Sequence, residues 1–283
     1  TAAALAAVTR KLEIMVAVRP TFHNPALLAK QAANIDHISR GRLSLNVVSA
    51  WWAEEARKFG VHFEEHDDRY ARTAEWLDVV DGVWSGDHFS YDGKYYRVSD
   101  NVLQPKPVAQ PRPRVYAGGE SEAAKNLIAQ KADAYLMHGD SPERIAEKVR
   151  DLSERRERLA PNKPALQFGV AGYVVLRDSQ REVERELARI TDVQASAAGY
   201  ENFKQWTSNS KLEHQLSLQD YSVSNRGLRS GLVGTPEQVS EQVEGFNDAG
   251  VDLLLLQFSP QYEEMERFAA QVISGRVLEA QAS

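Results

Sequence analysis

Runs of apolar residues alternate with amphipathic stretches along most of the chain. Several of the apolar runs are continuous rather than alternating, which is typical of strands that are covered on both faces in a parallel sheet. The alternation of such strands with helical stretches predicts an α/β fold. The expected strands are Leu12–Val18, Leu43–Val48, Arg114–Ala117, Ala134–Met137, Leu166–Leu176 and Leu253–Phe258.

Local capping signals mark several helix starts. Ser141 and Thr235 are cap residues that each precede a proline at the first helical position. Gln238 stands where it closes a capping box with Thr235. Residues 1–8 resemble the end of a helix. The other expected helices are Pro25–Ile38, His66–Trp84, Ser121–Lys131, Pro142–Leu159, Gln180–Ile190, Pro236–Ala249 and Gln261–Val272.

Two regions interrupt this rhythm. After the helix that opens at His66, the segment His88–Val98 is typical of a hairpin that turns at Asp92-Gly93. Residues 195–230 are polar, rich in Ser and Asn, and without a clear period. Long irregular segments inside compact domains are usually lids or binding loops. We therefore expect one domain over residues 1–283, with insertions at about 64–101 and 195–230.

Composition narrows the class of protein. The chain has no cysteine, which excludes disulfides, thiolate metal sites and cysteine nucleophiles. Its net charge of −6 gives no support for a nucleic-acid or anionic-membrane partner. No apolar run approaches the ~20 residues that a membrane helix needs. Neither a metal-binding HExxH cluster nor a P-loop, GxSxG or GxGxxG motif is present. We expect a cytoplasmic enzyme without a bound metal.

Four short motifs occur in one order along the chain, and together they resemble the luciferase-like monooxygenases. Each motif alone is weak, but the set at this spacing is specific and spans nearly all of the chain. Within the family, the chain is most similar to the dimethyl-sulfone monooxygenases. The motifs are Asn46–Trp52, His66–Tyr70, Gln104–Pro107 and Tyr116–Ser121, and the further similar stretches are Tyr116–Asn126, Ala134–Ile145 and Gln257–Phe268.

The resemblance implies a TIM-type (β/α)₈ barrel. Such a barrel needs eight strands, and the pattern here predicts six. The alignment with the family makes these six the strands 3 to 8. Strands 1 and 2, from which the family takes part of its substrate and flavin contacts, are then expected to be missing from this sequence.

The resemblance also implies the chemistry. FMN would act as FMNH₂, supplied by a separate NAD(P)H-dependent FMN reductase, and O₂ would be the co-substrate. The expected reaction oxygenates dimethyl sulfone and cleaves a C–S bond to give methanesulfinate and formaldehyde. Because the family is generally oligomeric, a homodimer or homotetramer is expected. Two alternatives stay open: a monooxygenase of short alkanesulfonates such as methanesulfonate, and a non-catalytic flavin-binding or scaffold protein.

Loops that follow the strands form the active face of a parallel barrel, and the flavin contacts implied by the family lie there. Glycines let the backbone approach a ligand closely, and free amides at a helix start favour a phosphate. In isolation, the same residues are compatible with a plain strand-to-helix turn capped by Ser121 and with a solvated helix start. The expected cofactor contacts are Asn46, Ser49, Glu55, Arg69, Tyr70, Gly118, Gly119, Glu120 and Ser121.

Candidate catalytic residues come from two places. His138 follows the fourth expected strand, where it can donate to flavin or substrate. Arg226 lies in the polar segment and, by resemblance, on a lid that closes over the site, with Arg229 as a competing candidate. Trp51 and Phe258 are expected to line a small apolar pocket, although aromatic residues more often belong to the core.

One departure from the family bears on the substrate. The alkanesulfonate monooxygenases carry an Arg and a His at the positions matched by Ala171 and Tyr173, and a Tyr near the position of Ser259. A site without that Arg is poorly suited to a sulfonate anion, whereas the oxygens of a neutral sulfone accept ordinary hydrogen bonds. This difference favours a sulfone over a sulfonate.

Overall fold

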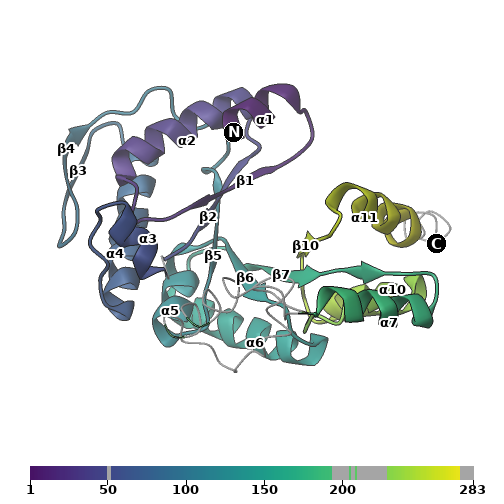
Figure 1. Cartoon of the computed structure of the whole chain (residues 1–283). Helices are drawn as coiled ribbons and strands as arrows, with labels where there is room; N and C mark the ends of the chain where they lie inside the picture. Colours follow the sequence, from purple (N-terminus) through teal and green to yellow (C-terminus); the bar gives the residue numbers. More distant parts are fainter. Residues whose placement is uncertain (50–51, 193–203, 205–207, 209–227, 275–283) are drawn as a thin grey trace. The chain divides into compact units, whose positions relative to one another are not determined.

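The computed structural model of the chain describes residues 1–49, 52–192, 204, 208 and 228–274. Its main sheet has six strands in the order β1-β2-β5-β6-β7-β10, and helices alternate with them along the chain (Figure 1). The α/β class and the six expected strands are confirmed, and the closed barrel stays a prediction. The strands are β1 (Ile14–Val18), β2 (Leu43–Val47), β5 (Arg114–Gly118), β6 (Ala134–His138), β7 (Gln167–Tyr173) and β10 (Leu253–Gln257).

Most of the remaining elements lie at the expected positions, and the short helix Ala53–Lys58 is an addition to them. Each predicted helix is present, with ends that differ by a few residues at most, except that the last one ends early and continues as a π-helical turn over Ala269–Ile273. The short strands are β3 (Phe89–Asp92), β4 (Arg97–Asn101), β8 (Val175–Leu176) and β9 (Val233–Gly234). The helices are α1 (Ala2–Val8), α2 (Pro25–Ser39), α3 (Ala53–Lys58), α4 (His66–Ser85), α5 (Glu122–Lys131), α6 (Pro142–Leu159), α7 (Gln180–Ile190), α10 (Pro236–Asp248) and α11 (Gln261–Phe268).

The chain falls into two compact units. The first comprises Thr1–Tyr135, Arg155–Leu166 and Ser208–Lys211, and the second comprises Leu136–Glu154, Gln167–Thr207 and Leu212–Ser283. The expected single domain over residues 1–283 stays a prediction.

The core of the first unit lies between its parallel strands and the helices α2 and α4. β2 pairs in parallel with both β1 and β5. Trp76 of α4 is 0% exposed, and its indole Nε1 donates to the carbonyl of His23 at 2.8 Å. The indole of Trp84 donates to the carbonyl of Ala29 in α2 at 3.0 Å. Buried indoles bring a large apolar surface and need one hydrogen-bond acceptor, so these two residues fix α4 against α2 and the loop before it.

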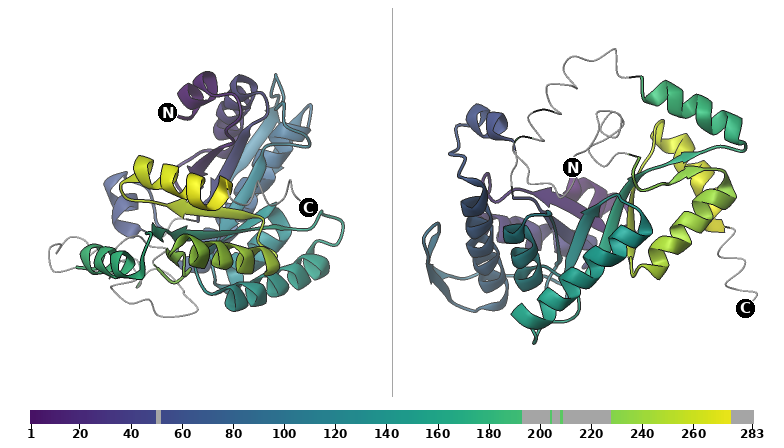
Figure 2. Two further views of the ribbon diagram at one scale, coloured as in Figure 1. Left: turned by 90° about the vertical axis from the view of Figure 1, so that its right-hand side faces the viewer. Right: turned by 90° about the horizontal axis from the view of Figure 1, so that it is seen from below.

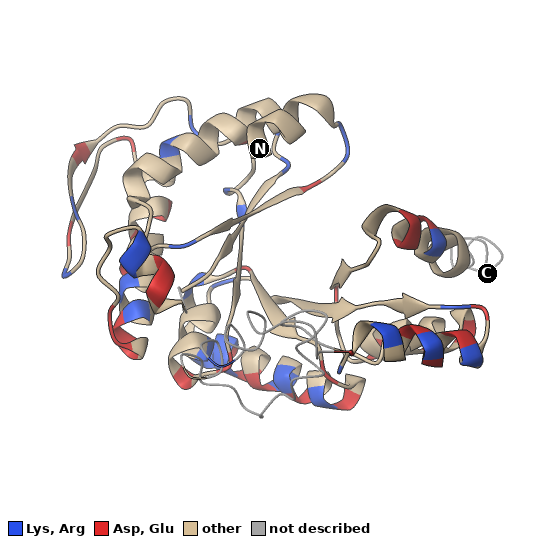
Figure 3. Ribbon diagram, viewed as in Figure 1, with Lys and Arg blue, Asp and Glu red and all other residues tan. Residues whose placement is uncertain are grey.

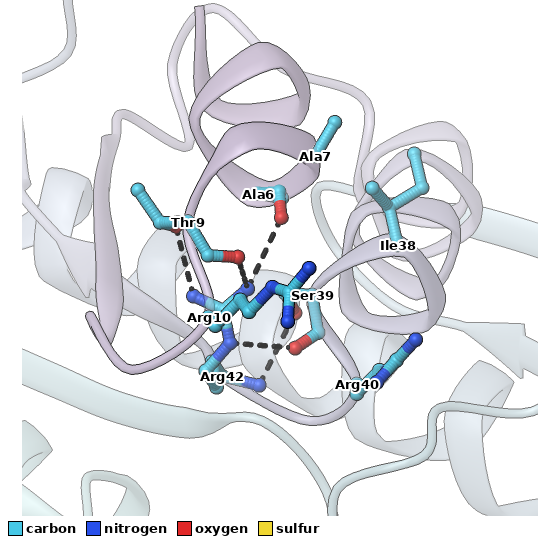
Figure 4. Close-up of a pocket in the computed structure, with 8 residues that line it drawn as sticks. All are labelled: Ala6, Ala7, Thr9, Arg10, Ile38, Ser39, Arg40 and Arg42. Atoms are coloured by element: carbon cyan, nitrogen blue, oxygen red, sulfur yellow. Dashed lines mark hydrogen bonds between the residues drawn. The ribbon is translucent and has the colours of Figure 1, made fainter.

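Arg42 ties the end of α1 to the end of α2 (Figure 4). Its guanidinium donates from Nε to the carbonyl of Ser39 at 2.7 Å and from Nη1 to Thr9 Oγ1 at 3.1 Å and the carbonyl of Leu12 at 2.5 Å. Nη2 donates to the carbonyls of Ala6 at 3.1 Å and Thr9 at 2.9 Å. Carbonyls at a helix C-terminus lack partners within the helix, so one side chain satisfies the ends of two helices.

Arg42 also borders a cavity of ≈ 370 Å³ (Figure 4). The cavity lies at the amino end of β2, because Arg42 directly precedes that strand. Ligands of parallel α/β proteins bind at the carboxyl ends of the strands, so this cavity is not the expected flavin site. Its other lining residues are Ala6, Ala7, Thr9, Arg10, Ile38, Ser39 and Arg40.

The first predicted insertion is a helix followed by a hairpin, as expected. β3 and β4 pair antiparallel, and the hairpin projects beside α4 (Figures 1 and 2). The carboxylate of Glu75 in α4 accepts from the backbone N–H of Lys94 at 2.9 Å and of Tyr95 at 2.8 Å. Asp68, two turns earlier on α4, accepts from the Lys94 ammonium at 2.9 Å and from the Tyr95 hydroxyl at 2.7 Å. These four bonds fix the hairpin to α4.

In the second unit, β7 and β10 pair in parallel. The expected strand Leu166–Leu176 is divided, because the chain changes partners at its end. The backbone N–H of Val174 donates to the carbonyl of Gln257, the last residue of β10, at 3.0 Å. The N–H of Val175 donates instead to the carbonyl of Leu232 at 3.0 Å, and the pairing of β8 with β9 begins there. The β9 strand has two residues, too few for its pattern to predict it.

Charged residues gather on the helices of the second unit, and the strands are largely free of them (Figure 3). Arg177, after β8, forms ion pairs with Glu264 of α11 at 2.7 Å and with Glu186 of α7 at 3.5 Å. It therefore links two helices through one guanidinium. No helix in the described part of the chain has both the length and the hydropathy that crossing a membrane requires.

Candidate functional site

The turn between β5 and α5 is built around a glycine. Gly119 has φ +141°, a conformation that residues with a Cβ rarely adopt. A Cβ at this position would lie 2.6 Å from Ala124 Cβ and 2.8 Å from the Tyr70 hydroxyl. The sequence therefore needs glycine here for two reasons, and the backbone comes into close contact with Tyr70 of α4.

Two hydroxyl groups meet at the start of α5. Ser121 caps the helix, accepting from the backbone N–H of Ala124 at 3.2 Å, and its side chain lies close to the Tyr70 hydroxyl. Burial raises the pKa of Tyr70 above its ordinary value, an effect that the nearby Ser121 side chain partly offsets. At neutral pH the phenol is therefore protonated and can donate. The first amides of α5, those of Glu122 and Ala123, lack an acceptor within the helix.

These features fit a phosphate group. Helix-start amides, the positive end of the helix dipole and two hydroxyls all favour an anion, and the missing Cβ of Gly119 opens the backbone to it. The nearby carboxylate of Glu122 is paired with Arg155, at 2.8 Å from Nη1 and 2.9 Å from Nη2, so its charge is compensated. The residues present are thus compatible with the phosphate of FMN.

Arg69 occupies a different environment from its neighbour Tyr70. The guanidinium lies over the ring of Phe63, 4.4 Å from the centroid, and donates to the carbonyl of Glu64 at 2.7 Å. The residue is 6% exposed, and burial lowers its pKa. Within the described part of the chain, its Nε has no hydrogen-bond partner. The structure brings Tyr70, Gly119 and Ser121 together and places Arg69 on Phe63 and Glu64.

Two other expected contacts lie at the carboxyl end of β2. Asn46 is half-buried and stands opposite Tyr116 of β5 in the strand register. Ser49 Oγ lies 2.9 Å from Thr73 Oγ1 of α4, and Thr73 in turn donates to the carbonyl of Arg69 at 2.8 Å. Ser49 therefore links the end of β2 to the helix that carries Tyr70.

Glu55, in α3, forms an ion pair with Arg19, a residue that the sequence reasoning missed. Arg19 directly follows β1, and its guanidinium lies over Phe22, 4.9 Å from the ring centroid. Burial, and then the charge of Arg19, lower the pKa of His23. The position of Arg19 after a strand was the available signal, because such positions lie on the ligand-binding face of parallel sheets.

In the second unit, His138 ends β6 and is half-buried. Phe258 packs against Phe268 of α11 with ring centroids 5.7 Å apart. Arg229 forms an ion pair with Asp140, two residues after His138, at 3.2 Å. Trp51 and Arg226 lie outside the described residues.

Tyr173 and Ser259 meet at the carboxyl ends of β7 and β10. Burial raises the pKa of Tyr173, and the nearby Ser259 side chain partly offsets this shift. Ala171 lies on the same strand and is 1% exposed. β7 thus carries a buried methyl at Ala171 and a neutral phenol at Tyr173.

The chain belongs to the family described as luciferase-like monooxygenases, whose model matches residues 1–253. It is 36% identical over 284 residues to a protein of Pseudomonas putida named FMNH(2)-dependent dimethylsulfone monooxygenase, covering 95% of this chain and 76% of that protein. A protein of the same name from Pseudomonas fluorescens (strain Pf0-1) is 35% identical over 294 residues, covering 99% of this chain and 78% of that protein. The expected family is confirmed, as are the flavin-dependent monooxygenase class and the FMNH₂ cofactor.

Solved structures agree on the fold. Long-chain alkane monooxygenase (LadA) matches with a TM-score of 0.84 and 20% identity, covering 98% of this chain and 72% of that chain. DmoA from Hyphomicrobium sulfonivorans matches with a TM-score of 0.78 and 20% identity, covering 99% of this chain and 70% of that chain. At this identity the likeness establishes the fold and does not define the substrate.

Proposed function

We propose that this protein is the oxygenase component of a two-component system that converts dimethyl sulfone to methanesulfinate and formaldehyde. FMNH₂ comes from a separate NAD(P)H-dependent reductase and O₂ is the co-substrate. In balanced form, dimethyl sulfone, FMNH₂ and O₂ give methanesulfinic acid, formaldehyde, FMN and water. One oxygen atom enters the substrate and cleaves a C–S bond, and the other leaves as water. When bound, FMNH₂ supplies the electrons and activates the oxygen.

The observation that carries this proposal is the convergence of Tyr70, Gly119 and Ser121 at the start of α5. In the proposal, these residues and the adjoining amides bind the flavin phosphate, and Gly118 and Glu120 complete the turn. In the same proposal, Asn46, Ser49 and Glu55 contact the remainder of the flavin, and Arg69 supports the part of α4 that carries Tyr70. The substrate contacts expected from the sequence, at Trp51, His138, Arg226 and Phe258, stay predictions.

The charge balance supports a neutral substrate. Arg19, after β1, is paired with Glu55, so its positive charge is compensated. Ala171 and the protonated Tyr173 add no positive charge on β7. A sulfonate anion needs an uncompensated cation or several donors, whereas a sulfone needs neutral donors alone. These features favour dimethyl sulfone over methanesulfonate.

The proposal includes the architecture in which the site is built. The chain adopts the TIM-type barrel of its family as one domain, with inserts near 64–101 and 195–230, and it assembles as a homodimer or homotetramer in the cytoplasm. Sedimentation of the purified protein measures the assembly, and a monomer at micromolar concentration contradicts it.

The deciding experiment is a reconstituted assay. Purified protein, an FMN reductase, NADH, FMN and oxygen are incubated with dimethyl sulfone, and formaldehyde and methanesulfinate are quantified. Equal amounts of both products, dependent on the reductase, support the proposal. Unconsumed dimethyl sulfone with turnover of methanesulfonate assigns the protein to the alkanesulfonate class. An anaerobic titration in which FMNH₂ shows no saturable binding overturns the flavoenzyme proposal altogether.

A further inference from the structure

Tyr135 is a buried phenol to which the proposed function assigns no role. It lies in β6 and is 0% exposed. Its hydroxyl donates to the carbonyl oxygen of Gly119 at 3.0 Å. A buried tyrosine hydroxyl needs a hydrogen-bond acceptor, and the carbonyl of Gly119, at the turn proposed to bind the phosphate, provides one.

The bond to the Gly119 carbonyl has a consequence one residue further on. The carbonyl of Gly119 and the N–H of Glu120 belong to one planar trans peptide and point in opposite directions. By holding the carbonyl, Tyr135 fixes the direction of the Glu120 N–H. Glycine at φ +141° leaves the backbone unusually free to rotate, so an external contact is needed to define this peptide.

Two phenols therefore hold one turn. Tyr70 closes the side on which a Cβ of Gly119 would lie, 2.8 Å from that position. Tyr135, from β6, contacts the carbonyl. The Tyr70 hydroxyl also lies close to Ser121, which caps α5, so it lies where it can contact an anion at this turn. Tyr135, by contrast, acts on the turn through its hydrogen bond to the backbone carbonyl of Gly119.

We propose that Tyr135 is a positioning residue for the phosphate of FMN, an inference that rests on the proposed function because that function puts the phosphate at this turn. Tyr135 does not touch the phosphate. It orients the Gly119–Glu120 peptide so that the amides before α5 face the anion. A residue that only fills the core would stabilise the protein without distinguishing FMN from riboflavin, which lacks the phosphate.

The test is Tyr135→Phe, which removes one hydroxyl and keeps the ring. Dissociation constants for oxidised FMN and for riboflavin are measured by flavin fluorescence at fixed salt. We expect the dissociation constant for FMN to rise about fivefold and that for riboflavin to stay unchanged, since the loss of one neutral hydrogen bond corresponds to a change of about this size.

The control is Tyr116→Phe. Tyr116 is 4% exposed, and its hydroxyl contacts Arg114 at 3.2 Å and Glu13 at 3.4 Å, away from the turn.

Two results overturn the inference: unchanged FMN affinity in Tyr135→Phe, and an equal loss for FMN and riboflavin. If the variant does not fold, 3-fluorotyrosine at position 135 replaces it. The fluorinated phenol is a stronger donor and polarises the bonded peptide. The affinity for FMN should therefore rise, whereas the affinity for riboflavin should stay unchanged. No change, or a change common to both flavins, contradicts the inference. Failure of the proposed function shows separately, as unconsumed dimethyl sulfone in the wild-type assay.

Discussion

Arg19 and Glu55 form an ion pair between two segments that each follow a strand of the first unit, Arg19 after β1 and Glu55 in the helix after β2. Their side chains are 39% and 17% exposed. Such a pair is partly screened by solvent and contributes modestly to stability. Its larger effect is on the local charge. The negative charge of Glu55 cancels the positive charge of Arg19 at the carboxyl ends of the strands, where a ligand is expected.

Glu55→Gln should therefore change the preference between neutral and anionic substrates. The variant leaves the charge of Arg19 uncompensated. We expect the ratio of kcat/KM for methanesulfonate to that for dimethyl sulfone to rise about fivefold, the scale of a partly exposed ion pair. Because the ratio compares two substrates on the same flavin-loaded protein, a change in flavin affinity cancels.

Glu54→Gln is the matched control for this ratio. Glu54 lies on the same short helix and pairs with Arg57, whose side chain is 72% exposed, at 2.5 Å. Removing that carboxylate should leave the ratio unchanged. If both variants shift the ratio equally, the effect is one of net charge and the role given to Arg19 is wrong.

Gly119→Ala should weaken FMN binding at least tenfold and lower stability by about 1–3 kcal/mol. The new Cβ meets both a backbone conformation that alanine rarely adopts and the Tyr70 hydroxyl at 2.8 Å. FMN titration and thermal unfolding measure the two effects. Gly60→Ala separates them, because Gly60 also has a positive φ, +67°, but a Cβ there meets nothing within 4 Å. Equal FMN affinity in the two variants would show that the corner does not bind the flavin.

Arg42→Gln should destabilise the first unit by about 2–3 kcal/mol, since it leaves the carbonyls at the ends of α1 and α2 without a charged donor. Urea unfolding gives the free energy difference. Arg40→Gln is the comparison: Arg40 borders the same cavity and is exposed, and within the described residues it has no ion-pair partner. A loss of similar size in both variants would contradict the bridging role of Arg42.

Glu186 should make stability depend on pH. Its hydrogen bond to Arg189, followed by the charge of Arg177, lowers the pKa of this carboxyl below its ordinary 4.5. A depressed carboxyl pKa contributes stability above the ordinary value, and that contribution is lost as pH falls through the folded-state pKa. Glu186→Gln should cost about 1 kcal/mol at pH 7, a difference that shrinks progressively below pH 4.5.

The control for the pH effect is Glu182→Gln. Glu182 is on the same helix, 43% exposed, and 3.9 Å from Arg185. Denaturant unfolding at several pH values should place this variant within a few tenths of a kcal/mol of the wild type throughout. A difference for Glu186→Gln that stays constant down to pH 3 would exclude titration of Glu186 as its source.

Local signals in the sequence were sufficient for most elements. The hairpin at Asp92-Gly93, the cap at Ser121 and the capping box of Thr235 and Gln238 each depend on neighbours within a few positions, and all three are present. β9 was missed because two residues, Val233–Gly234, are too few for a period to be seen.

The candidate site was less accessible to prediction, because its contacts join distant segments. Arg19 and Glu55 are 36 positions apart in the sequence. Tyr135 lies in β6, and its hydroxyl bonds the carbonyl of Gly119, which follows the neighbouring strand β5. Neither pair has a spacing that signals contact, since their approach depends on strand order and on how each loop folds back. The family motifs predicted residues at the turn, whereas the phenol that holds it lies in an ordinary apolar strand.

The hairpin of β3 and β4 is bonded to α4 through Asp68 and Glu75, and Asp68 is two residues from Tyr70. The insert therefore braces the helix that brings Tyr70 to Gly119. A single proteolytic cut beside the exposed Asp92 at the hairpin tip would weaken these contacts while leaving every proposed ligand contact chemically intact. Changing the length of this insert would thus alter cofactor affinity without altering any residue proposed to contact the cofactor.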